Sequence, residues 1–135
     1  MKKLFFILLT FVIFSNVSAE SRFGELTFMR DEKMRGKDNQ WVRPHPGPFV
    51  WSFIEQSKGN FVWDETDKHM KYSQERNQKI LATIWPYATW DQKTCNKKKK
   101  GRSPFKGFPK RMNKPCSMPD YLNFLTLLID RYDGD

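Results

Sequence analysis

The chain has 135 residues, of which 39% are hydrophobic and 29% are charged, and its formal net charge is +9. This length allows one modest domain. Beyond the N-terminus the sequence has no apolar stretch long enough to cross a membrane, which argues against a membrane-embedded protein.

Residues 1–19 have the pattern of a secretory signal peptide. Lys2 and Lys3 precede an apolar run from Leu4 to Phe14, and Val17-Ser18-Ala19 has the small residues of a cleavage site. The run is too short for an ordinary spanning helix, so an uncleaved anchor is the weaker alternative. We therefore predict a mature chain of residues 20–135 that is secreted or periplasmic and does not contact the membrane after cleavage.

Positive charge is concentrated in one segment. Between Lys93 and Lys114 there are ten basic residues and no acidic one. The net charge of the rest of the mature chain is therefore about −3. Cys95 and Cys116 bracket the segment, and an oxidising compartment makes a disulfide between them the default expectation. The bond would close a basic loop over residues 92–117. Metal binding is the weaker reading, because no Cys or His between the two thiols completes a tetrahedral site.

The first elements of the mature chain are short. Residues 23–28 can form a strand and residues 31–37 a helix with only Met34 as an apolar face. Trp41-Val42-Arg43 starts a second strand, which must end in the segment Pro44-His45-Pro46-Gly47-Pro48 because proline removes backbone donors.

A compact apolar cluster follows at residues 49–54 and can form one helical turn before Lys58-Gly59-Asn60 turns the chain. Asp64 is a candidate N-cap for a helix that runs to Asn77, a residue type able to adopt the left-handed conformation that closes a helix.

The most informative stretch is Lys79 to Asp91. Residues 80–84 are apolar or β-branched, are closed by Pro86, and predict a strand buried on both faces of a parallel sheet. Trp85, Tyr87 and Trp90 come next, where α/β proteins place their binding sites. The sequence predicts an aromatic wall on which a sugar ring can stack; the alternative is that these rings close the end of a core.

The last helix is the clearest. Ser117-Met118-Pro119-Asp120 has a serine cap, a proline in the first turn and an acidic residue three places after the cap. Apolar residues then recur at helical spacing up to Tyr132. Alternating strands and helices predict an α/β class.

The residues from Trp41 to about Trp90 resemble the early strands of a large clan of glycoside hydrolases. The resemblance is carried by Trp41-Val42-Arg43, Phe49-Val50-Trp51, Ile54-Glu55 and Lys58-Gly59-Asn60-Phe61-Val62-Trp63, in that order and spacing. These enzymes are (β/α)8 TIM barrels with two catalytic glutamates, and they include β-galactosidases, β-xylosidases and endoglycanases.

The resemblance implies an incomplete TIM barrel with a carbohydrate substrate, no cofactor, no metal and no nucleic-acid partner. It places Arg43 at the barrel mouth, where the matching arginine hydrogen-bonds the catalytic nucleophile. The substrate-binding residues expected from the residue pattern and the resemblance are Arg43, His45, Trp51, Trp85, Tyr87, Trp90 and Asp91.

Departures from the clan pattern are equally informative. Gln56 stands where proline is frequent, and none of the six glutamates lies in the Asn-Glu context of the clan's strand-end pair. A complete barrel needs about 250 residues. We therefore expect the N-terminal part of a glycoside hydrolase, with part of the sugar-binding wall and no catalytic residue of its own. The alternatives are a secreted module that binds polyanions through the basic segment, and a truncated gene product without function.

Overall fold

The computed structural model describes residues 24–27, 38, 40–45, 47–95 and 112–133. The predicted signal peptide, the predicted helix at residues 31–37 and most of the basic segment lie outside these ranges.

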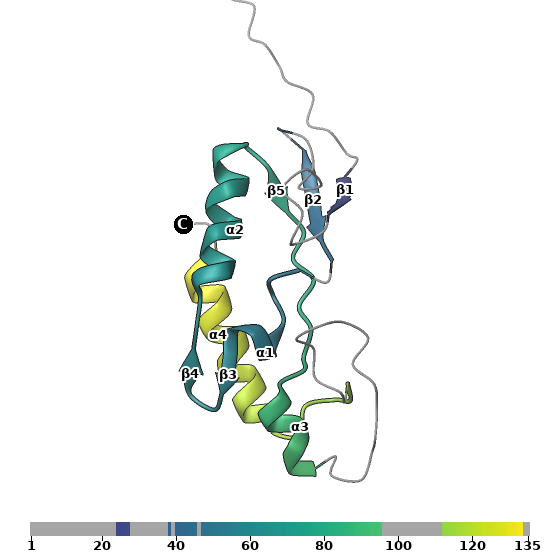
Figure 1. Ribbon diagram of the computed structural model, residues 1–135, viewed down its shortest axis with the longest axis vertical. Coiled ribbons are helices and arrows are strands. Elements are labelled where there is room, and N and C mark those ends of the chain that lie inside the picture. The colour runs from purple at the N-terminus through teal and green to yellow at the C-terminus, as the bar shows by residue number, and fades with distance from the viewer. Residues whose placement is uncertain (1–23, 28–37, 39, 46, 96–111, 134–135) are drawn as a thin grey trace, which may run out of the picture.

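A three-stranded parallel sheet forms one end of the described structure (Figure 1). Its strands are β1 (Gly24–Thr27), β2 (Trp41–Pro44) and β5 (Lys79–Ile80), in the order β1-β2-β5. Trp41 pairs with Lys79 and Val42 with Ile80. The chain reaches β5 from β2 by way of helix α2 (Asp64–Glu75), which links the two parallel strands.

Between β2 and α2 the chain makes one helical turn and a hairpin. The turn is α1 (Trp51–Ile54), as the apolar cluster predicts, and the hairpin pairs β3 (Glu55–Ser57) with β4 (Asn60–Phe61). Gly59 has a φ of 79°, which favours glycine in this turn. The hairpin therefore reverses the chain at the predicted Lys58-Gly59-Asn60 position.

Helix α2 (Asp64–Glu75) begins differently from the prediction and ends close to it. Its N-cap is Trp63 and no side chain caps it; Asp64 is the first helical residue. At the other end Asn77 has a φ of 50°, as predicted. The amides of Asn77 and Gln78 donate to the carbonyls of Gln74 and Ser73, which is the hydrogen-bond pattern of a Schellman cap.

The prediction of a strand buried on both faces at residues 80–84 is wrong. Strand β5 ends at Ile80, and Leu81 is 57% exposed. The chain then continues to Trp85, which forms an isolated parallel bridge with Val50. Along β2 the buried Val42 and Pro44 alternate with the exposed Trp41 and Arg43, so one face of the sheet is buried and the other is exposed. A strand in such a sheet buries only half of its side chains.

Two helices complete the described chain. Helix α3 (Thr89–Cys95) contains Asp91, and α4 (Met118–Tyr132) follows the basic segment. The Ser117 hydroxyl accepts a hydrogen bond from the Asp120 amide at 3.4 Å, so the predicted cap is confirmed. Lys58 in the hairpin turn pairs with Asp120 at 2.8 Å and joins β3–β4 to the start of α4.

The hydrophobic core is formed by α1, α4 and the segments that precede α1 and α3, and Met70 of α2 and Ile80 of β5 pack against it. Its buried members are Phe49, Trp51, Ile54, Ala88, Phe124 and Leu128. Trp51 packs near-parallel to Phe124 with ring centroids 5.9 Å apart. No helix within the described ranges has the length and apolar character needed to cross a membrane.

Candidate functional site

Three aromatic rings are in contact beyond the carboxyl ends of β2 and β5. The Trp85 ring meets the His45 ring at a centroid distance of 5.5 Å and an angle of 65°, and the Tyr87 ring at 5.9 Å and 82°. All three residues are half-buried, so part of each remains accessible to solvent. We call His45, Trp85 and Tyr87 the aromatic strip; it contains three of the seven predicted site residues.

Backbone hydrogen bonds to the segment before and within α1 hold the strip in place. The Trp85 amide donates to the Phe49 carbonyl at 3.1 Å, and the Trp51 amide donates to the Trp85 carbonyl at 3.0 Å. The Ser52 amide donates to the Tyr87 carbonyl at 2.9 Å. A surface whose backbone is already fixed loses little conformational entropy when it binds a ligand.

Arg43 lies beside the strip. Its Nε donates to Thr83 Oγ1 at 3.0 Å, which aligns the end of β2 with the segment that leads to Trp85. The side chain is exposed, and Nε is its one engaged nitrogen within the part of the chain that the structure describes. The terminal nitrogens can therefore meet a ligand.

The strip continues along the uncovered face of the sheet, which we call the open face. Side chains alternate along a strand, and Leu26, Trp41 and Leu81 are exposed whereas Thr27 and Val42 are buried. The Lys79 ammonium lies 5.6 Å from the centre of the Trp41 ring. Sequence reasoning missed Trp41, Lys79 and Thr83 as surface neighbours, although the Trp-x-Arg alternation in β2 placed Trp41 and Arg43 on one face.

Two predicted tryptophans point into the protein instead. Trp51 is fully buried, and its indole nitrogen donates to Glu55 Oε2 at 2.6 Å. The Trp90 indole donates to the Glu55 carbonyl at 3.1 Å and packs edge-on against Trp51. Trp51 therefore has a structural role, and Trp90 is half-buried beside the hairpin, separate from the strip.

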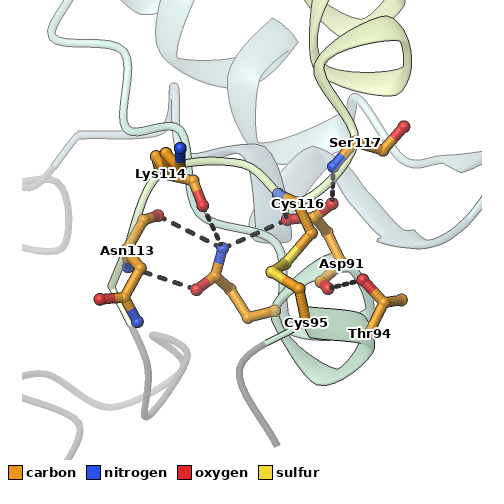
Figure 2. The surroundings of a disulfide bond; sticks show 8 residues. Asp91, Thr94, Cys95, Asn113, Lys114, Cys116 and Ser117 are labelled. Atoms are coloured by element: carbon orange, nitrogen blue, oxygen red, sulfur yellow. Dashed lines mark hydrogen bonds between the residues drawn. A yellow bond between two sulfur atoms is a disulfide. The ribbon is translucent and has the colours of Figure 1, made fainter.

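Asp91 is also buried and has a structural role. Its two carboxylate oxygens accept hydrogen bonds from the amides of Cys116 and Ser117, each at 2.9 Å (Figure 2). Gln92 adds bonds to the backbone of Asn113 and Lys114. These contacts fasten the start of α4 to α3 across a gap of 25 or 26 residues in sequence.

The predicted disulfide between Cys95 and Cys116 is present, one turn further along α3 (Figure 2). The disulfide and the hydrogen bonds of Asp91 and Gln92 therefore close the basic segment at the same place. Asp91 was predicted to touch sugar because it follows the aromatics, but nothing in the local sequence indicates that its partners are amides of Cys116 and Ser117.

Both carboxylate oxygens of the buried Glu55 are engaged inside the protein. They accept hydrogen bonds from the Trp51 indole and from the Gly59 amide. Among the described residues no group of three His, Cys, Asp or Glu side chains could hold a metal ion.

Comparisons with protein-family models, with curated proteins and with solved structures found no match.

Proposed function

We propose that this chain is the N-terminal part of a secreted glycoside hydrolase of the two-glutamate barrel clan, and that it carries part of the wall that binds a poly- or oligosaccharide. The observation that supports the proposal best is the aromatic strip with Arg43 beside it, at the carboxyl edge of a parallel sheet. This is the edge where α/β proteins bind ligands.

The chemistry of the strip suits a sugar. A sugar ring has an apolar face of C–H groups and a rim of hydroxyls, and the rings of tryptophan, tyrosine and histidine combine an apolar body with a polar edge. Arg43 adds donors for hydroxyl or carboxylate oxygens. Because the strip lacks a carboxylate, the chain contributes binding and leaves the chemical step to residues outside it.

Exposed apolar surface supports the incomplete barrel. Leu26 and Leu81 on the open face are 54% and 57% exposed, and Leu122 and Ile129 on α4 are 55% and 56% exposed. A parallel sheet is ordinarily covered on both faces, and contiguous exposed apolar patches mark sites of further packing. Additional strands and helices of a barrel would cover these side chains.

Affinity electrophoresis through gels that contain soluble polysaccharides tests the binding role. We expect retardation of the purified mature chain by at least one polysaccharide. Trp85→Ala should lose affinity about fivefold, which corresponds to the ~1 kcal/mol contribution of an aromatic contact. Tyr72→Ala is the matched control, because Tyr72 is a half-buried aromatic ring on α2 and does not belong to the strip.

If the Trp85 and Tyr72 variants are retarded equally, the strip is not part of the binding surface. Absence of retardation by every neutral and acidic polysaccharide would contradict the proposed function.

A second candidate function is polyanion binding by the basic segment. It is favoured by the charge of residues 93–114 and by the way the disulfide, Asp91 and Gln92 close that segment at its base. Phosphate binding weakens steeply with added salt, whereas stacking on a neutral sugar does not. Binding to a nucleic acid or sulfated polymer that disappears at high salt, with no affinity for neutral polysaccharide, would favour this candidate.

A further inference from the structure

The Arg43 side chain extends toward the aromatic strip. Between β2 and β5, Val42 pairs with Ile80. The Leu81 amide then donates to the Val42 carbonyl at 2.9 Å, which makes Leu81 the backbone neighbour of Arg43. Arg43 Nε nevertheless bonds Thr83, two residues beyond Leu81. The guanidinium is therefore held nearer to the strip than the register of the strands alone would place it.

Two pairs of side chains repeat along these segments. Arg43 and Thr83 are 40 residues apart in sequence, and the ring pair His45 and Trp85 has the same separation. Each segment advances by two residues between the pairs, and residues two apart in an extended chain lie on the same side. Binding sites of TIM barrels lie at this carboxyl edge, so the Arg43–Thr83 pair stays accessible when further barrel elements cover Leu81.

Thr83 restricts the Arg43 guanidinium. Threonine is stiff about its first side-chain torsion because it is β-branched, and Thr83 is half-buried. Arg43 is exposed, and its two terminal nitrogens are bonded to no described residue. A long exposed side chain without an anchor loses rotamer freedom when it binds a ligand. The bond to Thr83 orders the side chain before a ligand arrives.

From this geometry we infer that Thr83 is a positioning residue for sugar binding. It fixes the Arg43 guanidinium so that the terminal N–H groups donate to hydroxyl oxygens of a sugar ring stacked on Trp85. Thr83 itself does not contact the sugar. The inference rests on the proposed function and adds to it the residue that aims its polar contact.

Affinity electrophoresis in gels that contain soluble xylan, mixed-linkage β-glucan or galactan measures the effect. In the gel that retards the wild-type chain most strongly, Thr83→Val should weaken binding about threefold, because the freed Arg43 side chain must be ordered on binding. Thr83→Ser retains the hydroxyl and should bind like the wild type. Thr126→Val is the matched control, since Thr126 is an exposed threonine on α4; it should leave the affinity unchanged.

A double-mutant cycle separates positioning from direct contact. Arg43→Gln should weaken binding about fivefold, as expected when hydrogen bonds to a ligand are lost. Adding Thr83→Val to Arg43→Gln should cause no further loss, because Thr83 acts through Arg43. Losses that add in the double variant overturn the inference, because Thr83 then acts independently of Arg43. Equal affinity of Thr83→Val and the wild type, or of Thr83→Val and Thr83→Ser, also overturns it.

The Nε–H group of Arg43 provides a measurement that needs no ligand. In a ¹H–¹⁵N spectrum its signal, assigned by its loss in Arg43→Gln, should be protected from exchange with water in the wild type and in Thr83→Ser. The protection should be lost in Thr83→Val. Equal exchange in all three proteins overturns the positioning role and leaves the proposed sugar-binding function standing. If the protection is present but no polysaccharide retards the wild-type chain, both proposals are contradicted.

Discussion

The carboxylate of Asp67 on α2 is held by the guanidinium of Arg131 on α4. Arg131 donates from Nε to Oδ1 at 2.8 Å and from a terminal nitrogen to Oδ2 at 2.6 Å, and the Tyr132 hydroxyl donates to Oδ1 at 2.6 Å. The bonds from Arg131 are the main reason that the pKa of Asp67 lies below its ordinary value of 3.8. The two longest helices are thus joined by charged side chains at a partly exposed position.

Asp67→Asn should destabilise the fold by about 1 kcal/mol near neutral pH, a value kept small because the pair is partly exposed to solvent. A carboxylate with a lowered pKa stabilises the folded state above its unfolded value, and this contribution is lost as pH falls through the folded pKa. The difference in stability between variant and wild type should therefore shrink as the pH falls from neutral to below the ordinary value of 3.8. Urea denaturation at neutral pH and at acidic pH measures this difference.

Asp130→Asn is the control for this prediction, since Asp130 is exposed on the same helix as Arg131. If the Asp67 and Asp130 variants have equal urea midpoints at neutral pH, the bonds from Arg131 contribute nothing measurable.

Asp91→Ala should be more damaging than Asp67→Asn. It leaves the part-buried amides of Cys116 and Ser117 without the carboxylate oxygen that each now bonds, and a buried donor that loses its partner costs about 1–3 kcal/mol. Asp130→Ala is the comparison that removes an exposed carboxylate. A loss below about 1 kcal/mol in the Asp91 variant would contradict a structural role for the Asp91 carboxylate.

A separate prediction concerns the disulfide between Cys95 and Cys116. The native mature chain should contain no titratable thiol, and reduction should make residues 97–114 more sensitive to trypsin. A bond that closes a loop of this size stabilises by roughly 3 kcal/mol on the chain-entropy model. Two titratable thiols in unreduced, secreted material would rule out the bond.

Purified chain from Glu20 to Asp135 should hydrolyse no glycoside, because the strip has no general acid and no nucleophile. Release of chromophore from aryl glycosides is a sufficient assay. Turnover that survives further purification, and that disappears when one of the chain's own carboxylates is changed, would contradict the proposal that this chain binds sugar without catalysing hydrolysis.

Local patterns predicted the local features of this fold. The cap at Ser117, the turn at Gly59 and the left-handed Asn77 each depend on a few neighbouring residues, and each is present in the structure. The disulfide followed from two cysteines and an expected oxidising compartment. These features need no knowledge of what lies across the fold.

Features that depend on distant partners could not be predicted in this way. An apolar run indicates that a strand is buried, but it does not show whether one or both faces of the sheet are covered. For this reason Leu81 was wrongly predicted to be buried. Asp91 accepts from the amides of Cys116 and Ser117, which lie 25 and 26 residues further along the chain and which the surrounding sequence does not reveal. Trp51 belongs to the apolar cluster at residues 49–54. That cluster correctly indicated a position in the core, whereas the aromatic ring alone suggested contact with a ligand.

The most direct test of the proposed sugar binding at the aromatic strip uses the five tryptophans as reporters. Each indole N–H gives one signal in a ¹H–¹⁵N correlation spectrum, and single Trp→Phe variants assign them. On titration with the saccharide that retards the chain most strongly in the gels, the signal of Trp85 should shift furthest. The signals of Trp51 and Trp90, whose N–H groups bond Glu55, should stay in place. Shifts confined to Trp51, Trp63 or Trp90, with Trp85 unmoved at saturation, would contradict sugar binding at the aromatic strip.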